Sequence, residues 1–165
     1  VRQTLENIAM QQAEAGDHEA AVKTLEERLL FVPRLSDEVV AQTRASLAIE
    51  YLQLDKLDAA EEVMLEARHL ALDRDAPVAP SVAALVLMTS GRCRELTADA
   101  ELAADTMHGS TSGQLKAALM YQSALEFYQR ANSLVDEPAS REGISRVMAH
   151  LPKEVITESD DQARL

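Results

Sequence analysis

Apolar residues recur every three or four positions through most of this chain of 165 residues, which is the spacing of one face of an α-helix. Two such stripes lie near the start, and Gly16 and Asp17 separate them. Glycine readily ends a helix, and aspartate caps the next one by accepting a hydrogen bond from its free amides. The segment therefore predicts two short helices joined by a tight turn. Their inward faces consist of Leu5, Ile8, Ala9 and Gln12, and then of Ala21, Val22, Leu25 and Leu29.

Helix-ending residues divide the rest of the chain into further helices. Pro33 ends the second helix because proline cannot continue the hydrogen-bond ladder, and Ser36 is placed to cap the third. The clearest linkers are residues 73–80 and 108–113, which are rich in Pro, Asp, Gly and Ser. Together these signals predict about eight helices. Those after the first pair are expected at 37–54, 58–72, 81–92, 97–107, 114–135 and 139–150.

The helix pairs repeat along the sequence. Displacing residues 5–33 by 39 positions places them over residues 44–72, and a further displacement by 40 gives a weaker third copy in which Arg94 and Glu95 fill the expected tight turn. The clearest matches are Ala9 with Ala48, Leu25 with Met64, and Ala21 with Ala60 and then Ala100.

The repeat predicts one domain over residues 1–152. Its helix pairs are expected at residues 3–35, 36–76, 78–109 and 114–151. The last pair does not keep the register of the others, so it is either a degenerate repeat or the capping element that ends such arrays. Residues 153–165 carry acidic residues without an apolar stripe and are expected to form a flexible tail.

Composition narrows the fold class. Hydrophobic residues make up 47% of the chain, which is enough for a core, but aromatic residues make up 3% and tryptophan is absent. Sheets rely on aromatic and β-branched residues, whereas Ala, Leu, Glu and Gln favour helices. We therefore expect an all-α fold.

Charge and cysteine content limit the partners and the compartment. The net charge of −12 opposes binding to nucleic acid or to an anionic membrane and favours a basic partner. Cys93 is the single cysteine, so no internal disulfide can form, which fits a reducing, cytoplasmic environment. No apolar run approaches the roughly 20 residues of a membrane span, and no signal peptide is recognised before the first helix.

The repeated positions resemble the tetratricopeptide repeat, here with an extended period of 39 to 40 residues. That family has a large and then a small apolar residue in the first helix, a turn such as Gly-Asp, an early Ala in the second helix and a final Pro. The matching residues are Ile8, Ala9, Gly16, Asp17, Ala21, Leu25 and Pro33 in the first copy, and Leu47, Ala48, Tyr51, Ala60, Met64 and Ala67 in the second. The resemblance implies a right-handed α-solenoid of stacked helical hairpins, whose first helices line a concave groove.

The resemblance also implies which residues face that groove. Polar amides in the first two copies suit hydrogen bonds to a peptide backbone, and the third copy offers an apolar anchor. The implied residues are Gln3, Glu6, Asn7, Met10 and Glu14, then Gln42, Ala45, Ser46, Ile49 and Gln53, and finally Val82, Leu85, Val86 and Thr89. The alternative interpretation is an ordinary surface, with residues 82–86 packing on the last helix pair.

One specialisation of the family, the carboxylate clamp that grips chaperone C-termini, uses Lys, Asn and Arg side chains. The matching positions here are Gln3, Asn7, Ser46, Val82 and Val86, so the Asn alone is kept. A free carboxylate would find no cationic partner at these positions, and a chaperone-tail adaptor is not expected.

A rival interpretation is a carboxylate-bridged di-metal site in a helical bundle. Glu66 and His69 lie one helical turn apart, as do Asp105 and His108, and di-iron proteins use Glu-x-x-His in this way. Such sites need two more inward glutamates, however, and a histidine in the last turn of a helix is explained by the helix dipole. We expect neither a metal nor another cofactor.

Nucleophilic catalysis has little support. Cys93 lies between Arg92 and Arg94, whose charges would favour the thiolate, but no placed His or Asn accompanies it. The pattern is more typical of a partly buried structural cysteine. His18 and His150 have no recognisable partner in the sequence.

The sequence therefore favours a non-catalytic protein-interaction module that binds a peptide or helix of a partner in its groove. Two alternatives stay open: a ligand-sensing arm of a larger bacterial regulator and, more remotely, a di-metal enzyme. Homo-oligomerisation through the last helix pair is compatible with the sequence.

Overall fold

The computed structural model describes residues 4–31, 35–72, 78–108 and 112–151. Within these ranges the chain forms seven α-helices and no strand, which confirms the all-α class. None of these helices is both long enough and apolar enough to cross a membrane. The helices are α1 (Leu5–Glu14), α2 (His18–Leu29), α3 (Asp37–Gln53), α4 (Leu57–Leu72), α5 (Pro80–His108), α6 (Ser112–Leu134) and α7 (Pro138–Met148).

The predicted turn between the first two helices and the predicted cap of the third are confirmed. The Asp17 carboxylate accepts a hydrogen bond from the Ala20 amide at 3.1 Å, and the Ser36 hydroxyl accepts one from the Val39 amide at 3.3 Å. Gly16 has a φ of 79°, a left-handed conformation that glycine adopts without steric cost. Pro33 and the tail at 153–165 lie outside the described residues.

The expected break within the third copy is wrong, because α5 is continuous from Pro80 to His108. Glu95, expected in a tight turn, is instead a buried helical residue whose carboxylate accepts hydrogen bonds from Arg146 and Tyr128. No proline interrupts this stretch, and Gly91 lies against the ring of Tyr128 inside the helix. The described chain therefore has seven helices where about eight were predicted.

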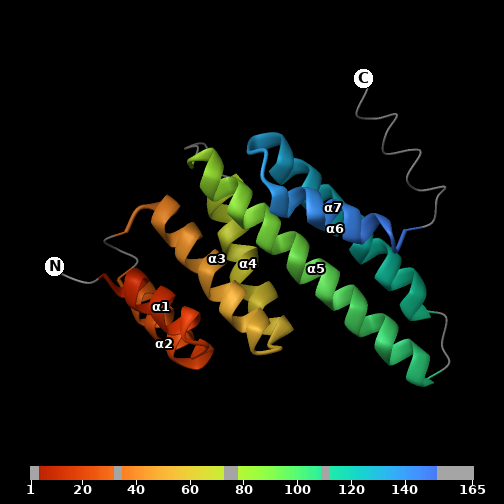
Figure 1. The fold of residues 1–165 in the computed structure, drawn as a ribbon, viewed down its shortest axis with the longest axis horizontal. Helices are drawn as coiled ribbons and strands as arrows, with labels where there is room; N and C mark the ends of the chain where they lie inside the picture. The colour runs from red at the N-terminus through yellow and green to blue at the C-terminus, as the bar shows by residue number, and fades with distance from the viewer. Residues whose placement is uncertain (1–3, 32–34, 73–77, 109–111, 152–165) are drawn as a thin grey trace.

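Helices that are neighbours in sequence lie side by side, as Figure 1 shows. The helices α1 and α2 form one pair, and α3 and α4 form a second. The long α5 pairs with α6 along most of its length, and α7 packs back against both of them (Figure 1). The third hairpin therefore consists of α5 and α6, with α7 as a single terminal helix.

Small residues allow the close approach of these helices. Ala9, Ala21, Ala48 and Ala60, which occupy matching positions of the first two copies, are each at most 3% exposed. Ala100, the equivalent position proposed for the third copy, is exposed instead. The reason is that no turn follows Gly91. Ala100 therefore lies in the second half of the continuous helix α5 and not in a separate helix that packs back against the first half.

Candidate functional site

A hollow of about 330 Å³ lies between α1 and α3. Its lining includes six of the residues that the tetratricopeptide resemblance assigned to a groove. These are Glu6, Met10 and Glu14 from α1, and Gln42, Ser46 and Ile49 from α3. Buried Ala9 and Leu25 contribute further apolar surface, so the hollow combines an apolar interior with polar groups.

Ion pairs and hydrogen bonds across α1, α2 and α3 show the relative directions of these helices. Glu6 at the start of α1 pairs with Arg28 at the end of α2, with 3.0 Å between carboxylate oxygen and guanidinium nitrogen. His18 at the start of α2 contacts Glu50 near the end of α3, with 2.7 Å between Nδ1 and the carboxylate. The helix α2 is therefore antiparallel to both neighbours, and α1 and α3 run in the same direction. The Gln42 amide of α3 also donates to Glu6 at 3.2 Å.

The sequence did not identify His18, Arg28 or Glu50 as members of this region. His18 has no recognisable partner in the sequence, and in the structure it contacts Glu50, a residue 32 positions away with a side chain that is 11% exposed. Arg28 occupies a position where the repeat pattern has a small residue, and it reaches Glu6 instead. No local sequence signal distinguishes these pairs, because each depends on the way that the first three helices pack.

A second hollow, of about 480 Å³, lies between α3, α5 and α7. Ile49 lines both hollows, so they adjoin along the face formed by α1, α3, α5 and α7. The predicted residues Gln53, Leu85 and Thr89 belong to its lining. Its charged residues are Asp55, Arg92, Glu142 and Arg146.

A charge network centred on the buried carboxylate of Glu95 joins three side chains that line this second hollow, Arg92, Tyr128 and Arg146. Glu95, which is 4% exposed, accepts hydrogen bonds from Nε of Arg146 at 2.8 Å and from the Tyr128 hydroxyl at 2.9 Å, and Arg92 approaches it at 3.1 Å. Burial alone would raise the pKa of Glu95, but these bonds and the charge of Arg92 together lower it below its ordinary value. Burial and the Glu95 charge raise the pKa of Tyr128, so its hydroxyl stays a donor.

The remaining predicted groove residues lie elsewhere. Val82 and Val86 are 7% and 0% exposed and pack in the core with Ala45 and other residues of α3 and α4, so they do not line the hollows. Asn7 is exposed and does not belong to the lining of the α1–α3 hollow. Gln3 lies outside the described residues.

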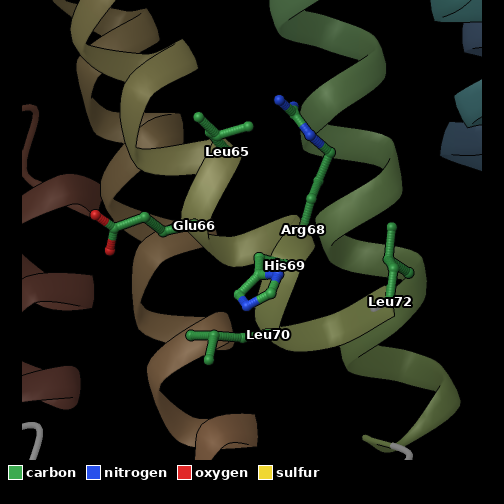
Figure 2. Close-up of a pocket in the computed structure, with 6 residues that line it drawn as sticks. All are labelled: Leu65, Glu66, Arg68, His69, Leu70 and Leu72. Atoms are coloured by element: carbon green, nitrogen blue, oxygen red, sulfur yellow. The ribbon is translucent and has the colours of Figure 1, made fainter. Parts of the chain in front are cut away.

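The candidate metal motifs are not assembled with other ligands in the described part of the chain. No group of three or more His, Cys, Asp or Glu side chains there is arranged to hold a metal ion. Glu66 pairs with Arg44 of α3, and Figure 2 shows Glu66 and His69 leaving α4 in different directions. Asp105 accepts a hydrogen bond from the Gln114 amide at 3.2 Å, and the His108 side chain lies outside the described atoms.

Cys93 lacks the features of a nucleophile. It is 1% exposed, and burial together with the charge of Glu61 raises the pKa of its thiol to about 12, although Arg68 and Arg94 act in the opposite direction. The protonated thiol is a poor nucleophile. Cys93 is therefore a core residue, in agreement with the more conservative interpretation of the sequence.

A third hollow, of about 600 Å³, lies over α4 (Figure 2). Leu65, which is 63% exposed, lies on it, and Arg68 extends from it toward α5, where it donates to the Ser90 hydroxyl at 3.3 Å. Arg68 also lies 5.7 Å from the centre of the Phe127 ring of α6. The described lining comes from a single helix, so this hollow does not bring together residues of different repeats.

Comparisons with known proteins assign no family to the chain. A scan of the sequence against protein-family models gives no match. A search of the curated proteins gives no match either. Function must therefore be argued from the helices and the hollows between them.

Proposed function

We propose that this chain is a non-catalytic protein-interaction module of the tetratricopeptide type. In this proposal the hairpins α1–α2, α3–α4 and α5–α6 stack as a right-handed solenoid, and α7 caps the last of them. The helices α1, α3, α5 and α7 then line one concave groove, which binds a short peptide or a helix of a partner.

The observation that carries the proposal is that residues of two different repeats, among them the equivalent pair Met10 and Ile49, line one hollow. Glu6, Gln42 and Ser46 are polar, whereas Met10 and Ile49 are apolar, and all five line one hollow. Backbone groups of a peptide need donors and acceptors, and its side chains need apolar pockets, so this mixture suits a peptide ligand.

The acidic character of the chain favours a basic partner. Glu6, Glu14 and Glu50 line the α1–α3 hollow, and the whole chain carries a net charge of −12. Such a field raises the association rate of a cationic partner more than it raises the affinity. It equally disfavours direct binding to nucleic acid.

A selection from a library of random displayed peptides on the full chain tests the proposal. Ser46→Trp fills the α1–α3 hollow with a bulky side chain, and we expect the selected peptides to lose most of their affinity for this variant. Ser133→Trp is the matched control, because Ser133 is exposed on α6 and belongs to neither groove hollow. Circular dichroism would verify that both variants keep the helical content of the parent chain.

Two results would contradict the proposal. One is a selection that yields no peptide above the background of the empty support. The other is a set of peptides that bind the Ser46→Trp variant as tightly as the Ser133→Trp variant.

A ligand-sensing arm of a larger regulator is the second candidate, and the sizes of the hollows favour it. Volumes of about 330 and 480 Å³ fall within the range of small-molecule sites. A small molecule in the hollow between α3, α5 and α7 would contact three helices and could change their packing. Thermal unfolding of the chain in the presence of fractionated metabolites tests this candidate, which predicts a reproducible rise in the midpoint with at least one fraction.

A further inference from the structure

We propose that the hollow between α1 and α3 binds a lysine or arginine side chain of the partner segment, with Glu14 as the carboxylate that receives the charge. This inference rests on the proposed function, since it assigns the side chain that occupies one part of the groove. It is narrower than a general preference for basic partners, because it places the cation at one hollow and at one carboxylate.

Two helix ends give this hollow a negative potential. Glu14 is the last residue of α1, and Glu50 lies in the last turn of α3. The two helices run in the same direction, so both negative dipole ends lie at the same end of the hollow. A helix C-terminus favours cations, and neither α1 nor α3 has a basic residue in its last turn. Carboxylates at these positions therefore add to the potential of the helix ends.

Glu14 is the carboxylate available to a ligand. Glu6 is already bonded to Arg28 and Gln42, and Glu50 is already bonded to His18. The Glu14 side chain has no ion pair or hydrogen bond with any residue in the described part of the chain, and it is exposed on the lining. An acid at a helix C-terminus without a partner is locally unfavourable, and a bound cation would remove that cost.

The apolar walls suit the aliphatic part of a long cationic side chain. Met10 is 56% exposed although it is a large apolar residue, and Ile49 lies across the hollow from it on α3. Lysine and arginine bury their methylene groups against such surfaces while keeping the charged end near water or a carboxylate. In the adjoining hollow Arg92 and Arg146 balance Asp55 and Glu142, whereas the described lining of the α1–α3 hollow has three glutamates and no basic residue, so the charge distribution favours a cation in the α1–α3 hollow.

Charge reversal of Glu14 is the test, with a matched control elsewhere on the chain. Glu14→Lys and Glu27→Lys change the net charge equally, but Glu27 is exposed on α2 and does not line the hollow. The probes are a short amphipathic peptide of leucine and lysine and the same peptide with glutamate for lysine, titrated by fluorescence anisotropy. We expect Glu14→Lys to lower the affinity for the lysine peptide about tenfold relative to Glu27→Lys. We expect Glu14→Gln to lower this affinity about two- to fivefold.

Further measurements distinguish a direct contact between the peptide and Glu14 from the effect of the net negative charge of the chain. The difference between the two lysine variants is expected to shrink as salt is raised, because exposed charge pairs are screened. Replacing single lysines of the peptide by glutamine should identify one position that couples to Glu14 in a double-mutant cycle. Lysine at position 14 suits the dipole of α1, so circular dichroism is expected to show an unchanged fold.

The outcomes are distinguishable. Equal weakening by Glu14→Lys and Glu27→Lys overturns the inference, as does failure of the lysine peptide to bind. If library peptides that depend on Ser46 prove to be acidic or uncharged, the proposed peptide groove is supported but the assignment of a cation site at Glu14 is wrong. If no peptide of any charge depends on Ser46, the proposed function fails as well.

Discussion

The ring of Tyr128 is enclosed by two glycines, and replacing one of them by alanine tests how α7 is held. A Cβ atom on Gly143 of α7 would lie 2.6 Å from Cε1 of Tyr128 and 2.7 Å from Cδ1 and Cζ. Unstrained carbon atoms lie about 3.5–4.0 Å apart, so the ring would have to retreat by about 1 Å. The ring also lies close to the backbone of Gly91 of α5, since a Cβ added there would be 3.0 Å from it, so little space remains on that side.

The expected loss of stability combines two opposing terms. Overpacking of a filled site costs about 1–3 kcal/mol. Alanine in place of glycine inside a helix contributes about 1 kcal/mol in the other direction. The Tyr128 hydroxyl is also bonded to Glu95 at 2.9 Å, which resists movement of the ring. We therefore expect Gly143→Ala to lower the free energy of unfolding by about 1 kcal/mol, within a range of about 0–2.

Urea denaturation followed by circular dichroism measures this change, and a second background isolates the clash. Valine at position 128 lacks Cδ1, Cε1 and Cζ, the three atoms nearest to Gly143, so Gly143→Ala in a Tyr128→Val chain should stabilise it by about 1 kcal/mol. The sign of the alanine effect is thus expected to differ between the two backgrounds. If alanine stabilises both chains equally, the ring does not pack against Gly143 and the reasoning is refuted.

Two further predictions follow from shifted pKa values. Because burial raises the pKa of the Cys93 thiol to about 12, a disulfide reagent at pH 8 should modify it slowly in the folded chain and rapidly in urea, and prompt reaction of the folded chain would contradict this. The lowered pKa of Glu95 means that its ionised form stabilises the fold above the unfolded-state value of about 4.3, and that this contribution is lost as pH falls through the folded-state pKa. Between pH 7 and pH 3 the parent chain should therefore lose more stability than a Glu95→Gln variant in urea titrations, and parallel losses would argue against the network.

The first two helix pairs could be predicted because short-range residues define their ends. Gly16, Asp17 and Ser36 act through backbone and capping bonds within a few positions, which the sequence displays directly. The length of α5 could not be predicted in this way. The expected break at 93–96 came from the repeat alignment, and Glu95 is held in the helix by Tyr128 and Arg146, which are 33 and 51 positions away.

The candidate site was predictable to the extent that it follows the repeat. The equivalent residues Met10 and Ile49 meet because α1 and α3 run in the same direction, but Asn7, the equivalent of Ser46, does not line the hollow. The same rule misplaced Val82 and Val86, because α5 presents a different face to α3 and α4 than the alignment assumed. The partners of charged residues were not predictable, since each depends on helices that are distant in sequence.

The two hollows of the proposed groove depend on different parts of the core. Arg146 of α7 both binds Glu95 and lines the hollow between α3, α5 and α7, so that hollow requires a docked α7. The α1–α3 hollow rests on a separate cluster that includes Ala9, Leu25 and Leu47. The Gly143→Ala variant should therefore alter the hollow between α3, α5 and α7 and leave the α1–α3 hollow unchanged. A lysine peptide held at Glu14 would bind this variant as it binds the parent chain, whereas a ligand that requires Arg146 would lose affinity.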